Sequence, residues 1–195
     1  ILDTAAALPG AIVVTGASTH DSLGGLLLGS TVEKLAHKLQ QPLLVVRRRV
    51  RGPYRRIMVA TDFTPAAQLA LQTAVRLFPD CPITVFHAHD SVELLGDDAQ
   101  GDAATLRAEF ARFLAACALP EAARAHVTPV IGEGEPASQL TRYVLEHDID
   151  LAVFGLHEES ALKRLLAGSR SDQLLQDVAC DSLVIRLSDP SGEHP

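Results

Sequence analysis

Short apolar runs alternate with longer amphipathic segments over most of the chain. The short runs suit buried strands, and the longer segments repeat their apolar residues at helical spacing. Strands are predicted at 56–62, 82–90, 126–134, 150–155 and 182–187. Helices are predicted at 64–78, 103–118, 136–147 and 168–178. This alternation predicts right-handed crossovers and an α/β fold with a doubly wound parallel sheet.

The first of these helices has a clear start, because Thr64 is followed by Pro65. A hydroxyl side chain suits the N-cap, and proline suits the first helical position. Ligands of a doubly wound sheet bind beyond the carboxyl ends of the strands, where the strand order reverses. The pattern therefore places Asp62, the turn after Asp90 and Gly155 near one another.

The two ends of the chain are related by an internal repeat with an offset of 139 residues and no gap. The first members of the matched pairs are Val14, Gly16, Leu23, Leu26, Leu27, Gly29, Ser30, Leu35, Val45 and Arg47. Their partners are Val153, Gly155, Leu162, Leu165, Leu166, Gly168, Ser169, Leu174, Val184 and Arg186. Shared glycines and leucines over this length indicate a duplication.

The first copy has no counterpart for residues 54–139, and "ILDTAAAL" matches the last turns of a helix. We therefore expect 1–50 to be the C-terminal part of a truncated first repeat, for a reason that the sequence leaves open. A basic linker is expected at 51–55, a complete domain at 56–188 and a tail at 189–195.

The composition is that of a globular protein that can bury a core, with 47% hydrophobic and 21% charged residues. A net charge of −7 argues against general nucleic-acid binding. Neither a membrane-spanning run nor a signal peptide is found. Cys81, Cys117 and Cys180 are few and far apart, which favours reduced thiols and a cytoplasmic location.

The segment "RRRVRGPYRR" (47–56) holds six of the 17 basic residues. It reads either as a patch for nucleic acid or phosphate, or as a solvated linker broken by Gly-Pro. We favour the linker, because no aromatic platform or basic helix accompanies it.

Three features together resemble the universal stress protein family: Asp62 at the end of a first strand, Gly-x-Pro before a helix, and a G-x2-G-x9-G-[ST]-like turn. The resemblance covers about 54–188 and again 1–50, as in tandem members with one repeat incomplete. It implies a five-stranded parallel sheet in the order 3-2-1-4-5, of the adenine nucleotide alpha hydrolase-like type. It also implies a homodimer, or intramolecular pairing of the repeats, through the fifth strands.

Some members of that family bind ATP, and the resemblance assigns a nucleotide site residue by residue. Asp62 matches the aspartate that contacts the adenosine. The other matches are Gly155, Gly168 and Ser169 in the second copy, and Gly16, Gly29 and Ser30 in the first. The middle glycine is replaced by Glu158 in the second copy and by Thr19 in the first, which also lacks its own aspartate. Mg²⁺ is expected only together with ATP.

Such a turn suits a phosphate, because glycines let the backbone approach an anion and the amides of a helix start point outward. The structural alternative is that Gly155 relieves a tight turn and Ser169 caps its helix. Glu158 and Glu159 oppose phosphate: at about 4 Å and an effective dielectric constant near 20, each like-charge pair costs on the order of 4 kcal/mol. Lys163 and Arg164 in the same loop offset part of that repulsion. We therefore expect a degenerate site.

Other candidate chemistry is weaker. His87 and His89 lie on one face of a predicted strand at a spacing suited to metal, but no carboxylate or cysteine cluster accompanies them. Asp97, Asp98 and Asp102 are expected in a solvated surface loop. Ser30 and Ser169 lack the context of a nucleophile elbow.

Three functions remain open. The first hypothesis is a stress-response binding or regulatory module, without catalysis beyond weak ATP hydrolysis. The others are an enzyme on the related adenine-nucleotide-binding fold and a pure dimerisation or interaction scaffold. The loop "ATDFTPAAQ" lacks the paired glycines of such enzymes. Two outcomes are predicted. The strand at 42–48 should pair with the strand at 182–187, because an exposed apolar edge strand favours aggregation unless it is covered. ATP should bind weakly or not at all, and Glu158→Gly should strengthen its binding.

Overall fold

The computed structural model describes residues 1–8, 10–17, 30–47, 49, 52–89, 99–156 and 178–187. The N-terminal elements are α1 (Leu2–Ala6), β1 (Val13–Gly16), α2 (Ser30–Lys38) and β2 (Leu43–Val46). They are followed by β3 (Ile57–Ala60), α3 (Pro65–Leu77), β4 (Ile83–His89), α4 (Ala99–Ala116), α5 (Glu121–Arg124), β5 (Val127–Glu133), α6 (Pro136–Glu146), β6 (Leu151–Leu156) and β7 (Asp181–Arg186).

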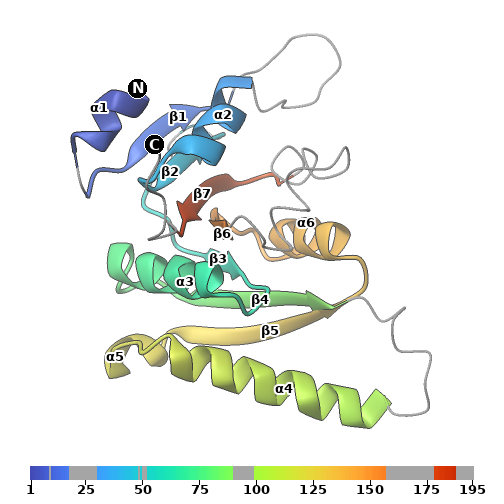
Figure 1. The fold of residues 1–195 in the computed structure, drawn as a ribbon. Helices are drawn as coiled ribbons and strands as arrows, with labels where there is room; N and C mark the ends of the chain where they lie inside the picture. Colours follow the sequence, from blue (N-terminus) through green and yellow to red (C-terminus); the bar gives the residue numbers. More distant parts are fainter. Residues whose placement is uncertain are drawn as a thin grey trace, which may run out of the picture.

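The described strands form one seven-stranded sheet in the order β1-β2-β7-β6-β3-β4-β5 (Figure 1). From β3 to β7 all neighbouring strands are parallel, and their order, β5-β4-β3-β6-β7, is the expected 3-2-1-4-5. The expected α/β class and doubly wound sheet are therefore confirmed.

The partial copy joins this sheet through its last strand. β1 and β2 are parallel, and β2 pairs antiparallel with β7. The predicted pairing of 42–48 with 182–187 is therefore confirmed, as an intramolecular contact. The secondary structure follows the internal repeat: the bounds of β1, shifted by 139 residues, give 152–155, which lies within β6.

Side chains of successive strand residues point to opposite faces, and each face has its own core. One core packs Ile57, Val59 and Val153 against α3 and α4. The other packs Met58, Ala60 and Phe154 against α6, and it continues without a break to α2 and the strands of the partial copy. The two copies thus share one of the two cores.

The outer side of β1 is less well covered than its counterpart in β6. Val14 is 60% exposed, whereas Val153, its equivalent in the repeat, is fully buried. Ile1, Leu2, Leu8 and Ile12 are further large apolar residues exposed in the same region. α3 covers Val153, and no described helix takes the corresponding place over Val14.

The linker region is fixed by two aspartates. The amide of Arg47 donates to Asp181 Oδ1 at 2.7 Å, and the Tyr54 hydroxyl donates to Asp181 Oδ2 at 2.8 Å. The amides of Arg55 and Arg56 both donate to Asp150 Oδ2 at 3.0 Å. Arg49, Gly52, Pro53, Arg55 and Arg56 are nevertheless exposed. The interpretation as a solvated linker therefore stays a prediction, with the addition that the backbone of Arg47, Arg55 and Arg56 is held to the start of β6 and β7.

One helix prediction needs correction, one helix was not predicted, and one prediction cannot be compared. α4 begins at Ala99 rather than 103, so Asp102 lies in a helix and not in the expected loop. α5 was not anticipated. The helix predicted at 168–178 falls almost entirely outside the described residues. Among the described helices, none has both the length and the hydropathy that a membrane span requires.

Candidate functional site

The carboxyl ends of β3 and β6 lie next to each other, because Ala60 is paired with Phe154 in a parallel ladder. Asp62 follows β3 by two residues, and Gly155 follows Phe154 directly. The sheet therefore brings together Asp62 and Gly155 as predicted, while the turn after Asp90 lies outside the described residues. This is also the point where the strand order reverses, from β3 to β4 on one side and from β3 to β6 on the other.

Asp62 is held by the loop that follows it. Its Oδ1 accepts hydrogen bonds from the Thr64 hydroxyl at 2.5 Å and from the Thr64 amide at 3.3 Å. Its Oδ2 is buried and has no hydrogen-bond partner among the described residues. A buried acceptor left without a donor costs free energy, so Oδ2 is a ready acceptor for a hydrogen bond from a ligand.

Thr64 is the N-cap of α3, as its position before Pro65 predicted. Its hydroxyl oxygen accepts from the amide of Ala67 at 3.4 Å while the same hydroxyl donates to Asp62. One side chain therefore both starts the helix and orients the carboxylate.

Phe63 is a site residue that sequence reasoning missed. It has a φ of 62°, an uncommon conformation for a bulky residue, and its ring stacks on His87 with 4.3 Å between centroids. Phe110 and Phe113 of α4 contact the Phe63 ring edge to face, at 5.3 and 5.7 Å. An aromatic residue between an aspartate and an N-cap was the only available signal, and it does not reveal the left-handed conformation.

His87 is fixed at the end of β4. Its Nδ1 lies 2.8 Å from the carbonyl oxygen of Thr61, which can only accept, so Nδ1 carries the proton. Burial lowers the pKa of His87 below its ordinary value; the charge of His89 acts in the same direction, and the bond to Thr61 opposes both. The neutral imidazole thus supports the loop that carries Asp62.

Gly155 is required by close packing rather than by a turn. It lies inside β6, paired with Ile185, and a Cβ there would overlap the carbonyl group of Ala66 and approach the amide nitrogen of Ala67 to 2.7 Å. The alternative that Gly155 relieves a tight turn is therefore wrong. Its absent side chain lets the first turn of α3 approach the strand, and this positions Thr64 and Asp62.

The remaining assigned residues are spread over the partial copy and over undescribed segments. Gly16 ends β1, and a Cβ on it would meet nothing within 4 Å. Ser30 is the first residue of α2. Gly29, Gly168 and Ser169 lie outside the described residues, as do Glu158, Glu159, Lys163 and Arg164. The phosphate half of the assigned site therefore stays a prediction.

Two further observations concern the carboxyl ends of the strands. No group of three or more potential metal ligands occurs among the described residues, which include His87 and His89. Glu135 caps α6 at the carboxyl end of β5, where Oε2 accepts from the amide of Ser138 at 2.8 Å and from its hydroxyl at 2.7 Å. Sequence reasoning missed this cap, because glutamate is not a usual N-cap residue.

The fold is similar to that of several solved proteins. A protein of unknown function from Pseudomonas aeruginosa PAO1 is 17% identical, with a TM-score of 0.66 over 90% of this chain and 62% of that chain. A universal stress protein from Archaeoglobus fulgidus DSM 4304 is 18% identical, with a TM-score of 0.61 over 91% of this chain and 61% of that one. The present chain thus spans about three fifths of the length of both.

A shorter relative matches less of this chain. The universal stress protein UspA from Lactobacillus plantarum is 22% identical, with a TM-score of 0.54, and the match covers 71% of this chain and 100% of that one. No curated protein matches the chain. The model of the universal stress protein family matches residues 1–47 and 53–186. With both segments matched, the chain belongs to the universal stress protein family.

Proposed function

We propose that this protein is a stress-response binding module that holds an adenine nucleotide beyond the carboxyl ends of β3 and β6. The observation that supports this most directly is Asp62 Oδ2, a buried acceptor without a partner among the described residues. Adenosine offers donors for it, in the amino group of the base and in the ribose hydroxyls. The Thr64 bonds hold the carboxylate in one orientation before any ligand arrives.

The geometry of Asp62 and Thr64 supports the adenosine half of the proposed site, whereas Glu158 argues against tight binding by the phosphate half. Gly155, Gly168 and Ser169 would bring backbone amides and a hydroxyl to the phosphates, with Mg²⁺ entering only as the companion of ATP. Glu158 opposes them by like-charge repulsion. ATP binding is therefore weak, and hydrolysis is at most slow. Gly16, Gly29 and Ser30 match the same motif in the sequence of the partial copy, which lacks an aspartate of its own.

The organisation of the chain is proposed as a truncated repeat (1–50), a linker (51–55), a complete domain (56–188) and a tail (189–195). The gap between the two segments that match the family model, 1–47 and 53–186, supports this division. Both edges of β7 are occupied, by β6 and β2. Pairing through the fifth strands is therefore intramolecular, and a homodimer would need another surface.

Calorimetric titration with ATP and Mg²⁺ tests the proposed function. The wild type should bind with a dissociation constant well above 1 μM, which is weaker than about −8 kcal/mol. Asp62→Asn should weaken binding about tenfold or more, because its Oδ1 keeps the Thr64 bonds while an amide donor replaces the Oδ2 acceptor. Glu158→Gly should strengthen binding.

The matched control is Asp3→Asn, which removes one negative charge from the exposed helix α1 and should leave ATP affinity unchanged. Submicromolar binding by the wild type would contradict a degenerate site. Equal losses in Asp62→Asn and Asp3→Asn would refute the role of Asp62.

A further inference from the structure

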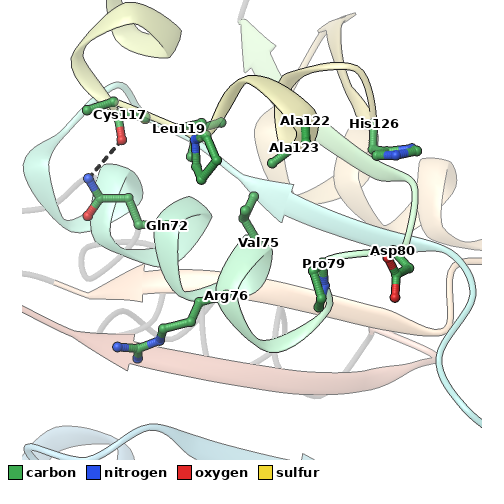
Figure 2. A pocket seen from close by; sticks show the side chains of 12 residues that line it. Gln72, Val75, Arg76, Pro79, Asp80, Cys117, Leu119, Ala122, Ala123 and His126 are labelled. Carbon is green, nitrogen blue, oxygen red and sulfur yellow. Dashed lines mark hydrogen bonds between the residues drawn. The ribbon is translucent and has the colours of Figure 1, made fainter.

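A pocket lies near the amino ends of the strands, whereas Asp62 lies beyond their carboxyl ends. It is formed between the C-terminal half of α3 and the segment that joins α4 to α5 (Figure 2). Its residues come just before β4 and β5, so it sits at the amino ends of these strands. Its volume is about 560 Å³, within the range of roughly 300–1,000 Å³ typical of small-molecule sites.

The two walls of the pocket are held in place by hydrogen bonds and backbone geometry. Gln72 Nε2 on α3 donates to the carbonyl oxygen of Cys117 at 2.9 Å, which ties α3 to the end of α4. Ala118 has a φ of 46° and turns the chain away from α4. The amide of Ala123 then donates to the carbonyl oxygen of Pro120 at 3.0 Å. The pocket is therefore formed without a ligand.

The floor of the pocket is apolar. Val75, Leu119 and Ala123 line it and are each at most 8% exposed. Pro79, Pro120 and Ala122 extend this apolar lining toward the opening. Transfer of an aliphatic chain from water onto such a surface is favourable by about 25 cal/mol per Å² of apolar area buried.

The polar groups are divided between the two ends. Gln72 and Arg76 are one helical turn apart on α3 and lie at one side in Figure 2, while Asp80 and His126 lie at the other. Arg76 is exposed and forms no ion pair with any described residue. A guanidinium group binds a carboxylate through two parallel hydrogen bonds. In Figure 2 the Arg76 guanidinium points away from Val75 and Leu119, so it reaches a carboxylate at this end of the pocket through a change of rotamer, which its exposure permits.

We propose that this pocket is a second ligand site, which binds a small aliphatic carboxylate. The carboxylate pairs with Arg76, and the chain covers Val75, Leu119 and Ala123. An amine of equal length is repelled at the Arg76 end and binds less tightly. The site lies away from the proposed nucleotide site and does not depend on it.

Titration of the full chain with octanoate, followed by calorimetry, tests the proposal. Saturable binding is expected, with octylammonium and octanol binding more weakly. Arg76→Gln should weaken octanoate binding three- to tenfold and remove its advantage over octanol. Ala122→Phe should abolish binding, because Ala122 is exposed at the mouth of the pocket and a phenyl ring there fills it. Arg112→Gln, on the exposed face of α4 outside the pocket, should bind octanoate as the wild type does.

Amide shifts of the wild type give a readout that needs no variant. Octanoate should move the amide signals of Ala122, Ala123 and Arg76 and leave those around Asp62 in place. Saturating ATP should not change octanoate affinity. The proposal is overturned if octanoate does not saturate, if octylammonium binds as well as octanoate, if ATP competes, or if the Arg112 and Arg76 variants lose affinity equally.

Discussion

Leu44 and Leu183 are equivalent residues of the internal repeat, 139 positions apart, and they face each other directly across β2 and β7. Leu43 pairs with Val184 and Val45 with Ser182, so the antiparallel register is symmetric about the leucine pair. The two copies therefore meet as two subunits of a symmetric dimer would, with the same strand offered from each side. The symmetry ends at the helices, because α3 covers the side of Leu183 and no described helix covers the side of Leu44 in the same way.

This asymmetry predicts unequal effects of truncating the two leucines. Leu183 is 2% exposed and belongs to the core under α3, whereas Leu44 is half-buried at the edge of that core. Leu183→Ala should lower the free energy of unfolding by about 3 kcal/mol, and Leu44→Ala by about 1 kcal/mol. Guanidinium unfolding of both variants measures the difference. Similar losses would mean that the side of Leu44 is covered as well as that of Leu183.

Gly16 of β1 and Gly155 of β6 give a second comparison of equivalent positions of the repeat. A Cβ on Gly155 would overlap the backbone of Ala66, whereas a Cβ on Gly16 would lie in open space. Gly155→Ala should therefore lower the free energy of unfolding by about 2–3 kcal/mol, because α3 must shift. Gly16→Ala should change it by less than about 0.5 kcal/mol. Thermal unfolding distinguishes the two, and a harmless Gly155→Ala would show that α3 moves without cost.

Much of the fold followed from local pattern and from the resemblance. The short apolar runs identified β3 to β7, and the strand predicted at 42–48 corresponds to β2, whereas β1 was not among the predicted strands. The pairing of β2 with β7 followed from the need to cover an apolar edge, which is a global argument that needs no coordinates. The start of α4 was missed because "AQGD" (99–102) is polar and contains glycine, yet the helix extends through it. Glycine in a helix costs only about 1 kcal/mol, which the rest of α4 supplies.

The site was less predictable, because its geometry depends on distances between elements. The position of Asp62 could be inferred from the end of a strand, but the orientation of its carboxylate depends on Thr64. The reason for Gly155 is the approach of α3, which no local pattern contains. The φ of Phe63 is uncommon for its residue type, so propensity argues against it, and contacts with His87, Phe110 and Phe113 decide the conformation instead.

Acid should weaken the loop at the site through His87. Its pKa is lowered in the folded protein, mainly by burial, so the unfolded chain takes up the proton first as the pH falls below about 6.5. The unfolded state then binds more protons than the folded state, and stability decreases as the pH falls toward the folded pKa. The imidazole signals of His87 should titrate with a midpoint below 6.5 by NMR.

A non-titrating ring provides the control for that pH dependence. His87→Phe keeps an aromatic partner for Phe63 but loses the bond to Thr61. It should be less stable than the wild type at pH 7.5, and the difference in unfolding free energy should shrink toward pH 5. A difference that stays constant over this range would contradict the assignment to His87.

Tyr54 connects the linker to β7, and its hydroxyl donates to Asp181 Oδ2 at 2.8 Å. Tyr54→Phe should lower the free energy of unfolding by about 2 kcal/mol at pH 7, because a hydrogen bond to a carboxylate is lost. Burial first, and then Asp181, raises the pKa of Tyr54, so only the unfolded phenol ionises as the pH rises above about 10. The free energy of unfolding of the wild type should then fall, and it should approach that of Tyr54→Phe between pH 9 and 11.

Tyr143→Phe is the matched control, since the Tyr143 ring stacks on His147 and its hydroxyl has no hydrogen-bond partner among the described residues. It should stay within about 0.5 kcal/mol of the wild type at every pH. Equal losses in both variants would show that ring packing, not the bond to Asp181, holds the linker.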